Sequence, residues 1–292
     1  MLAQVLWNSI PTALILAVNA SAFALIHRSS GVFHIAFASI WPATGTLFIQ
    51  LSNSSLLWPL AIPAAILLSL ALTVMCDRLV YAPLSMRSDS SLAAITASLG
   101  LHVVLLSSVL LVAGSETRML STVALSPAFQ LSQVRILWSQ LHSCFIVTAA
   151  LLLTALILQM TSASMKLRAL GDDPEGVELT GLNVRNTRSV AFLLAGFLTA
   201  AGAIAASTDA GMGPHQGMPV TLMAAVATIL AGDRTLLLGA SLAGFFIGTL
   251  QGIVAGYCPA RWQEVIVFST LTLAILIKGE GFLSAVKRLE ER

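Results

Sequence analysis

The sequence predicts an all-α fold, a polytopic bundle of about eight to nine transmembrane helices that forms a single domain over residues 1–292. Two observations lead to this fold class. Hydrophobic residues make up 57% of the chain and charged residues only 10%, and the mean hydropathy is +0.90. A soluble domain carries about 25% charged residues, so the solvent of this chain is expected to be largely lipid. In addition, long apolar runs recur along the sequence, with polar clusters between them.

The individual spans follow from the thickness of a bilayer, whose hydrocarbon core of about 30 Å needs about 20 apolar residues per helix. The segments of this kind are 5–26, 31–50, 56–77, 91–113, 136–160, 189–208, 235–256 and 263–278. A ninth segment, 217–231, is shorter, and we expect it to be tilted or to form only half a span.

The distribution of basic residues predicts the orientation of these spans. With the N-terminus outside and nine crossings, all of the 15 Lys and Arg residues except Arg118, Arg135 and Arg261 fall on the inside. Inner loops of membrane proteins are rich in Lys and Arg, so this arrangement is favoured over one with eight crossings. The polar loop 161–188 is then expected to face the cytoplasm.

Small residues and prolines indicate how the predicted helices pack. Glycines recur at every fourth position in the span 235–256, namely Gly244, Gly248, Gly252 and Gly256. On a helix they form a smooth stripe that lets another backbone approach closely. Pro42 lies inside the span 31–50, where it marks either a simple kink or a broken helix that lines a solute cavity.

The loop 161–188 contains the signals of a short helix of its own. Asp172 or Asp173 is a suitable N-cap, Pro174 and Glu175 suit the first turn, and Gly181 suits a C-terminal stop. A short surface helix between two spans adds little to stability, so we expect it to dock a soluble partner. A solvated connection with no partner is the alternative interpretation.

Neutral polar residues in the spans are candidates for a solute pathway, since no Asp, Glu, Lys or Arg lies near the middle of a predicted span. The candidates are Asn19, Ser21, His34, Thr96, Ser98, His102 and His142. Hydrogen bonding between helices is the alternative role for each of them. In the outer loop, Asp209 and His215 are candidates for contact with a binding protein, or simply solvated residues.

Several function classes are not supported by the sequence. Three well-separated cysteines without CxxC spacing predict no metal or redox site. No catalytic motif of the HExxH or GxSxG kind occurs, so no catalytic residue is predicted. A proton-coupled carrier is disfavoured because intramembrane carboxylates are missing, although a stand-alone carrier or channel remains the competing hypothesis. The chain has no phosphate-binding GxxxxGK[ST] loop, so any ATP must be hydrolysed on another chain.

Several segments together resemble the branched-chain amino acid ABC transporter permeases, a family that also includes permeases for urea and simple amides. The loop RALGDDPEGVELTGLNVRNTRSVAF resembles the family's cytoplasmic loop. GVFHIAFASIWPATG, RLVYAPLSMRSDSSLAAITASLGLHVVLL, the stretch 217–252 and EVIVFSTLTLAILIKGEGFL resemble family segments in the same order. The resemblance therefore extends over nearly the whole chain.

The resemblance implies an importer of the bacterial inner membrane for branched-chain or other small amino acids, with urea or short amides as the alternative. It implies a second permease subunit, related or identical, two cytoplasmic ATPase subunits that hold ATP and Mg²⁺, and a periplasmic solute-binding protein. By position, the element that couples the permease to the ATPase would consist of Arg168, Ala169, Asp172, Asp173, Pro174, Glu175 and Gly181.

The chain departs from the family pattern at two places. The second-span motif, in the family Asn-Phe-Ala-His-Gly, here runs from His34 to Ala38 and includes Phe37, which completes the predicted solute pathway. The family's Gly-Gly turn is replaced by Ala231 and Gly232. These differences concern the solute and leave the expected fold unchanged.

Overall fold

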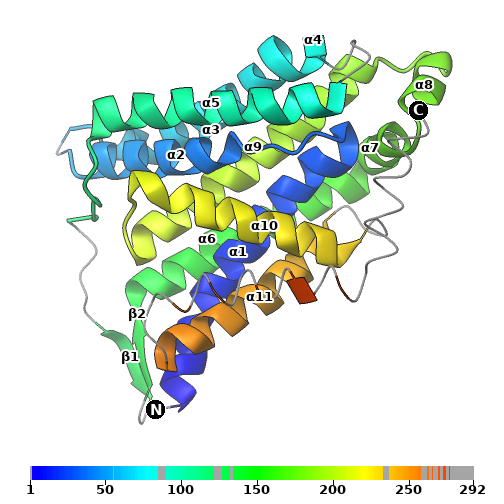
Figure 1. Cartoon of the computed structure of the whole chain (residues 1–292). Coiled ribbons are helices and arrows are strands. Elements are labelled where there is room, and N and C mark those ends of the chain that lie inside the picture. Colours follow the sequence, from blue (N-terminus) through cyan, green and yellow to red (C-terminus); the bar gives the residue numbers. More distant parts are fainter. Residues whose placement is uncertain are drawn as a thin grey trace.

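Long apolar helices form where most of the spans are predicted (Figure 1). The computed structural model describes residues 2–54, 56–84, 90–121, 127–131, 134–232 and 237–257, and single residues between 262 and 276. Within the described part, six helices are long and apolar enough to cross a membrane. The predicted total of eight to nine spans therefore stays a prediction, and the predicted span 263–278 lies mostly outside the described residues.

Helices make up most of the described chain, and one pair of short strands lies between two of the long helices. The elements are α1 (Leu2–Ser30), α2 (Phe37–Ser52), η1 (Trp58–Leu60), α3 (Ala61–Cys76), η2 (Asp77–Tyr81), α4 (Ala82–Leu84), α5 (Ser90–Ala113), β1 (Pro127–Leu131), β2 (Val134–Leu137), α6 (Trp138–Met160), α7 (Ala163–Asp172), α8 (Pro174–Leu179), α9 (Val184–Asp209), η3 (Pro214–Gln216), α10 (Gly217–Ala231) and α11 (Leu238–Tyr257). Of these, η2 is a π-helical turn that joins α3 to α4, and η1 and η3 are short 3₁₀ turns.

Two helices form the centre of the bundle and the other long helices surround them. In the most apolar 18-residue windows, 78% of residues are buried in α1 and 83% in α9, against 11% in α5 and 22% in α11. The outer faces of α5, α6 and α11 are apolar and exposed, as expected for helices that meet lipid. The central position of α1 and α9 makes them the elements through which the ends of the bundle are connected.

The predicted glycine stripe lies against α1. A Cβ atom on Gly244 would lie 2.8 Å from the Cα of Ala17, and one on Gly248 would lie 2.5 Å from the Cα of Ala13. Gly252 meets Ser9 and Gly256 meets Val5 in the same way, so both helices contribute every fourth residue. The missing side chains allow α11 to pack backbone to backbone on α1.

The predicted span 31–50 is shorter than expected, because its first residues are not helical. Gly31 ends α1 with φ +66°, a left-handed conformation that costs glycine nothing. Residues 31–34 then have no regular secondary structure, residues 35–36 form a turn, and α2 begins only at Phe37, with Pro42 inside the helix. The other short segment, 217–231, coincides with α10 and follows the 3₁₀ turn η3.

A small antiparallel sheet departs from the all-α expectation. The strands β1 and β2 pair with each other in the loop between α5 and α6, beside the N-terminal end of α1 (Figure 1). At the same end of the bundle, Arg118 and Met212 exchange two backbone hydrogen bonds of 2.9 Å. These contacts join loops that leave α5 and α9, and thereby fix the end of the molecule opposite to α7 and α8.

Candidate functional site

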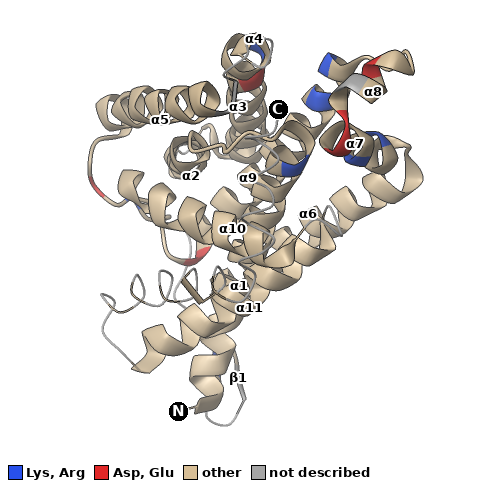
Figure 2. Ribbon diagram, turned by 45° about the vertical axis from the view of Figure 1, so that its right-hand side comes forward, with Lys and Arg blue, Asp and Glu red and all other residues tan. Residues whose placement is uncertain are grey.

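The charged ribbons of the bundle gather mainly around α7, α8 and the start of α9 (Figure 2). We call this the basic end after its Lys and Arg residues, which are Arg28, Lys166, Arg168, Arg185 and Arg188. It also holds the acidic residues Asp172, Asp173, Glu175 and Glu178. Helix α7 docks here on the bundle through Leu167 and Leu170, which are both buried. A Cβ atom on Gly171 would overlap the backbone carbonyl of Arg28, so α7 packs directly on the last turn of α1.

Helix α8 is capped at both ends by the residues that the loop pattern indicated. Asp173 has an extended backbone, and its carboxylate accepts a hydrogen bond of 3.1 Å from the backbone N–H of Gly176. Pro174 occupies the first turn, and Gly181 follows the helix with φ +79°. Leu179, the last residue of α8, is 90% exposed, which leaves an apolar side chain on a projecting element.

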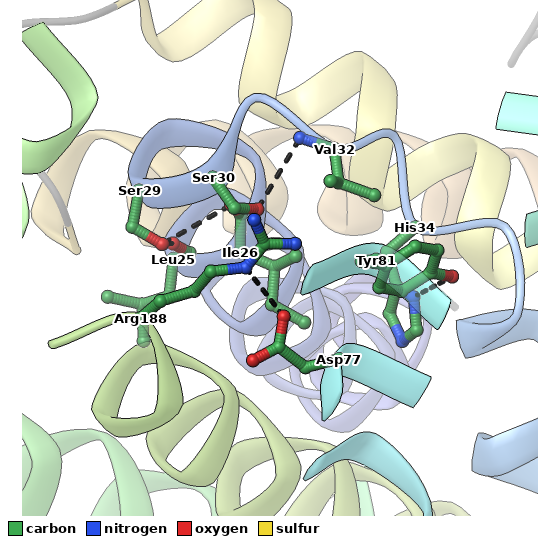
Figure 3. A network of polar contacts seen from close by, with 9 residues as sticks. All are labelled: Leu25, Ile26, Ser29, Ser30, Val32, His34, Asp77, Tyr81 and Arg188. Carbon is green, nitrogen blue, oxygen red and sulfur yellow. Dashed lines mark hydrogen bonds and ion pairs between the residues drawn. The ribbon is translucent and has the colours of Figure 1, made fainter. Parts of the chain in front are cut away.

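The segment after α8 leads directly into the central helix α9. The side chain of Asn183 caps α9 by accepting a hydrogen bond of 3.0 Å from the backbone N–H of Asn186. One turn later, the Nε of Arg188 donates a hydrogen bond of 2.6 Å to the Oδ1 of Asp77, and both side chains are buried (Figure 3). The guanidinium carbon of Arg188 also lies 5.7 Å from the ring centroid of Phe192.

This ion pair links the start of α9 to the π-helical turn η2. A single π turn inside an α-helix contains an extra residue and occurs frequently at functional sites. In this chain it carries Asp77 at its first position and Tyr81 at its last, and both residues are buried. One charge-assisted hydrogen bond therefore joins η2 to α9, and α9 follows α8 directly in the chain.

Tyr81 extends the connection to α2 and α5. Its hydroxyl lies 2.9 Å from the Nδ1 of His34 (Figure 3). The same hydroxyl donates a hydrogen bond of 2.8 Å to the Oγ of Ser98 on α5. Ser98 also accepts a hydrogen bond of 3.1 Å from the backbone N–H of Ala36, just before α2. If Tyr81 donates to Ser98, the Nδ1 of His34 is the donor to Tyr81.

The network contains buried polar atoms without partners. The Nε2 of His34, the Oδ2 of Asp77 and one terminal nitrogen of Arg188 form no hydrogen bond with the described residues. Buried polar groups are normally paired, and each exception raises the free energy of the state that contains it. A partly paired network at the basic end is thus suited to rearrangement between two states of the bundle.

The predicted pathway residues are spread over several helix contacts. His34 and Ser98 meet through Tyr81, and His102 forms a 2.6 Å hydrogen bond with Ser39 of α2. Ser21 bonds to Ser241 of α11 at 2.7 Å. Thr96 lies on an exposed face, and its hydroxyl donates a hydrogen bond of 3.0 Å to the backbone carbonyl of Leu92 in its own helix.

Asn19 differs from these residues because its buried amide has no partner among the described residues. Its Oδ1 occupies the space beside Gly202 of α9. Phe37 is buried at the start of α2. His142 stacks on Trp138, with 6.1 Å between ring centroids. The described residues thus bring only His34 and Ser98 of the predicted pathway into one network.

Three residues of the network are missing from the sequence-based prediction. Asp77 ends one predicted span, Arg188 precedes another, and Tyr81 follows Asp77 by one turn. The sequence did contain one signal for this contact: Asp77 and Arg188 have opposite charges, and both lie at the predicted cytoplasmic ends of their spans. The partners are 111 positions apart, so only the packing of α3 against α9 shows that they meet.

Together, the six candidate spans of the described part and the charged loops at the ends of the bundle define a multi-pass membrane protein. Its fold is similar to that of a solved transporter described as of the metal-chelate ABC type, in an inward-facing conformation. That likeness has a TM-score of 0.50 and 19% identity, and covers 98% of this chain and 85% of the other.

The family is defined more closely by sequence. The model of the family described as "branched-chain amino acid transport system / permease component" matches residues 5–276, and the chain belongs to this family.

Individual relatives transport different solutes. The high-affinity branched-chain amino acid permease BraD of Pseudomonas aeruginosa is 24% identical over 86% of this chain and 81% of its own length. The autoinducer 2 import permease LsrC of Klebsiella pneumoniae is 30% identical over 46% of this chain. The xylose permease XylH of Escherichia coli K12 is 28% identical over 44% of this chain. The chain spans only 41% and 36% of the lengths of LsrC and XylH.

Proposed function

We propose that this permease is the membrane subunit of a binding-protein-dependent importer of the bacterial inner membrane, and that α8 is the element through which a cytoplasmic ATPase moves the spans. The observation that supports this proposal is the continuous path from a capped, projecting helix to a buried ion pair. Displacement of α8 acts on α9, and Arg188 passes the movement to Asp77 and η2. ATP and Mg²⁺ belong to the ATPase partner in this scheme.

The proposed solute is a branched-chain or other small amino acid. BraD supports this choice because it aligns over most of the chain, whereas LsrC and XylH align over less than half. Neutral hydroxyl, amide and imidazole groups in the described bundle suit a net-neutral solute, since they bind it without an unpaired intramembrane charge. A sugar-like solute is the second candidate, favoured by LsrC and XylH.

Reconstitution with the ATPase and binding protein tests the role of α8. The Leu179→Asp substitution puts a charge on the exposed end of α8, and we expect it to reduce solute-stimulated ATPase activity at least about tenfold by weakening an apolar contact. Leu56→Asp is the control, since Leu56 is also strongly exposed (83%) but lies outside the basic end. Equal stimulation with both variants would rule out docking at α8.

Variants of the N-cap of α8 test independently whether the coupling of transport to ATP hydrolysis needs this helix to be rigid. Asp173→Ala removes the acceptor for the N–H of Gly176, whereas Asp173→Asn keeps an acceptor of similar capping strength. We expect the alanine variant to lower the transport rate per ATP hydrolysed and the asparagine variant to retain it.

Uptake of labelled leucine and of labelled xylose by the same proteoliposomes distinguishes the two solute classes.

The competing stand-alone carrier makes a different prediction. Vesicles that contain this chain alone would then take up solute along a gradient, without ATP. We expect no uptake above that of empty vesicles, because no Asp, Glu, Lys or Arg lies near the middle of the described spans to couple transport to an ion. Gradient-driven uptake by the isolated chain would overturn the importer proposal.

A further inference from the structure

A crevice of about 520 Å³ lies at the basic end, where α6 finishes and α7 begins, and where α11 starts. Its volume falls in the range of about 300–1,000 Å³ that is usual for small-molecule sites. Its polar wall comes from the residues around the start of α7, and its apolar wall comes from α6 and from Leu237 and Leu238. None of the coupling network around Asp77 lines it.

The polar wall carries an unpaired cation. Arg168 lines the crevice and is exposed, and its guanidinium makes no hydrogen bond or ion pair with the described residues. The hydroxyls of Ser162 and Ser164 lie in the same wall and are also unpartnered among the described side chains. Planar guanidinium donors with neighbouring hydroxyls suit the oxygens of a phosphate group.

The apolar wall continues onto the lipid-facing surface. Ala155 and Leu158 belong to the last turns of α6, and Leu238 is the first residue of α11 and is 63% exposed. Both helices are candidate membrane spans with mostly exposed apolar windows, 28% and 22% buried. The crevice therefore opens where two spans end, at the level of the lipid headgroups.

We propose that this crevice binds an anionic phospholipid, with its phosphate on Arg168 and the two serine hydroxyls and an acyl chain along Ala155, Leu158 and Leu238. A soluble anion would satisfy only the polar wall, and a zwitterionic lipid would bring its own cation towards Arg168. An anionic lipid matches both walls. Basic pockets between spans on the inner side of a membrane attract anionic headgroups for the same electrostatic reason. The proposal does not depend on the identity of the solute, and Arg168 is also one of the residues that the family resemblance assigns to ATPase coupling.

Native mass spectrometry of the purified full chain with added phosphatidylglycerol or phosphatidylcholine tests the proposal. We expect Arg168→Gln to lower the occupancy of one phosphatidylglycerol about tenfold, since it removes a charge-assisted contact. Lys166→Gln is the matched control, because it removes a charge from the same helix at a position that does not line the crevice. It should leave that occupancy unchanged.

A second variant separates lipid from free phosphate. Ala155→Phe fills the apolar wall and keeps Arg168, so it should reduce phosphatidylglycerol binding while the unfolding midpoint in detergent stays unchanged. Three results would overturn the proposal: equal phosphatidylglycerol binding by wild type and Arg168→Gln, equal retention of phosphatidylcholine, or displacement of phosphatidylglycerol by millimolar inorganic phosphate.

Discussion

At the scale of single residues, the contact between Asp77 and Arg188 is a buried ion pair with a hydrogen bond of 2.6 Å. Removing two charges from water is expensive, and their attraction offsets this cost only while both partners are present. Both residues are buried, and the guanidinium of Arg188 also packs over the ring of Phe192. Either residue alone would be a buried, unpaired charge.

Asp77→Asn should therefore destabilise the bundle by about 3 kcal/mol, because Arg188 then stays buried without a counter-ion. The double variant with Arg188→Gln should recover part of this loss, since neither charge remains. Thermal unfolding in detergent measures both effects. Arg185→Gln changes an exposed neighbouring residue and serves as the control. If Asp77→Asn lowers the unfolding midpoint as little as Arg185→Gln does, the ion pair does not stabilise the fold.

Tyr81→Phe isolates the hydroxyl that joins three elements. The variant keeps the ring but leaves the Nδ1 of His34 and the hydroxyl of Ser98 each short of one partner. We expect a loss of about 2 kcal/mol in unfolding free energy, since buried groups lose their hydrogen bonds. The Thr96→Val variant, on an exposed face of α5, should change the midpoint little. If both variants behave alike, the Tyr81 contacts carry no stabilising energy.

At the scale of elements, local sequence predicts helices better than it predicts the breaks between them. The limits of α6, α8 and α10 agree closely with the predicted segments, because length, capping residues and glycine act locally. The start of α2 could not be predicted in this way. Gly31 and the buried His34 interrupt an apolar run, and tertiary contacts with Tyr81 and Ser98 decide the local conformation.

The glycine stripe of α11 gives the clearest element-scale prediction. Gly248→Ala places a methyl group 2.5 Å from the Cα of Ala13, so the two backbones must separate. We expect about 2 kcal/mol of destabilisation, as for overpacked contacts. Gly100→Ala on α5 is the matched control, because no atom lies within 4 Å of the added Cβ. Equal unfolding midpoints for the two variants would contradict the close packing.

At the scale of the whole molecule, the positive-inside pattern predicts that α7 and α8 lie on the cytoplasmic side. In a chain whose native cysteines are replaced by alanine, Leu179→Cys on α8 and Ser115→Cys beyond α5 report the two ends. We expect an impermeant maleimide to label Leu179→Cys only in inside-out vesicles and Ser115→Cys only in right-side-out vesicles. Labelling of Leu179→Cys from the periplasm would remove the access that an ATPase requires.

The last turn of α1 offers a second route through the molecule. Arg28 contacts α7 through its backbone carbonyl, beside Gly171, and its side chain donates a hydrogen bond to the carbonyl of Gly232, the C-cap of α10. Arg28 therefore connects α7, the helix next to α8, with α10, a short helix that packs on α2. The contacts of Arg28 and the ion pair between Asp77 and Arg188 therefore form two parallel linkages from this end of the molecule into the bundle, and loss of one leaves the other in place.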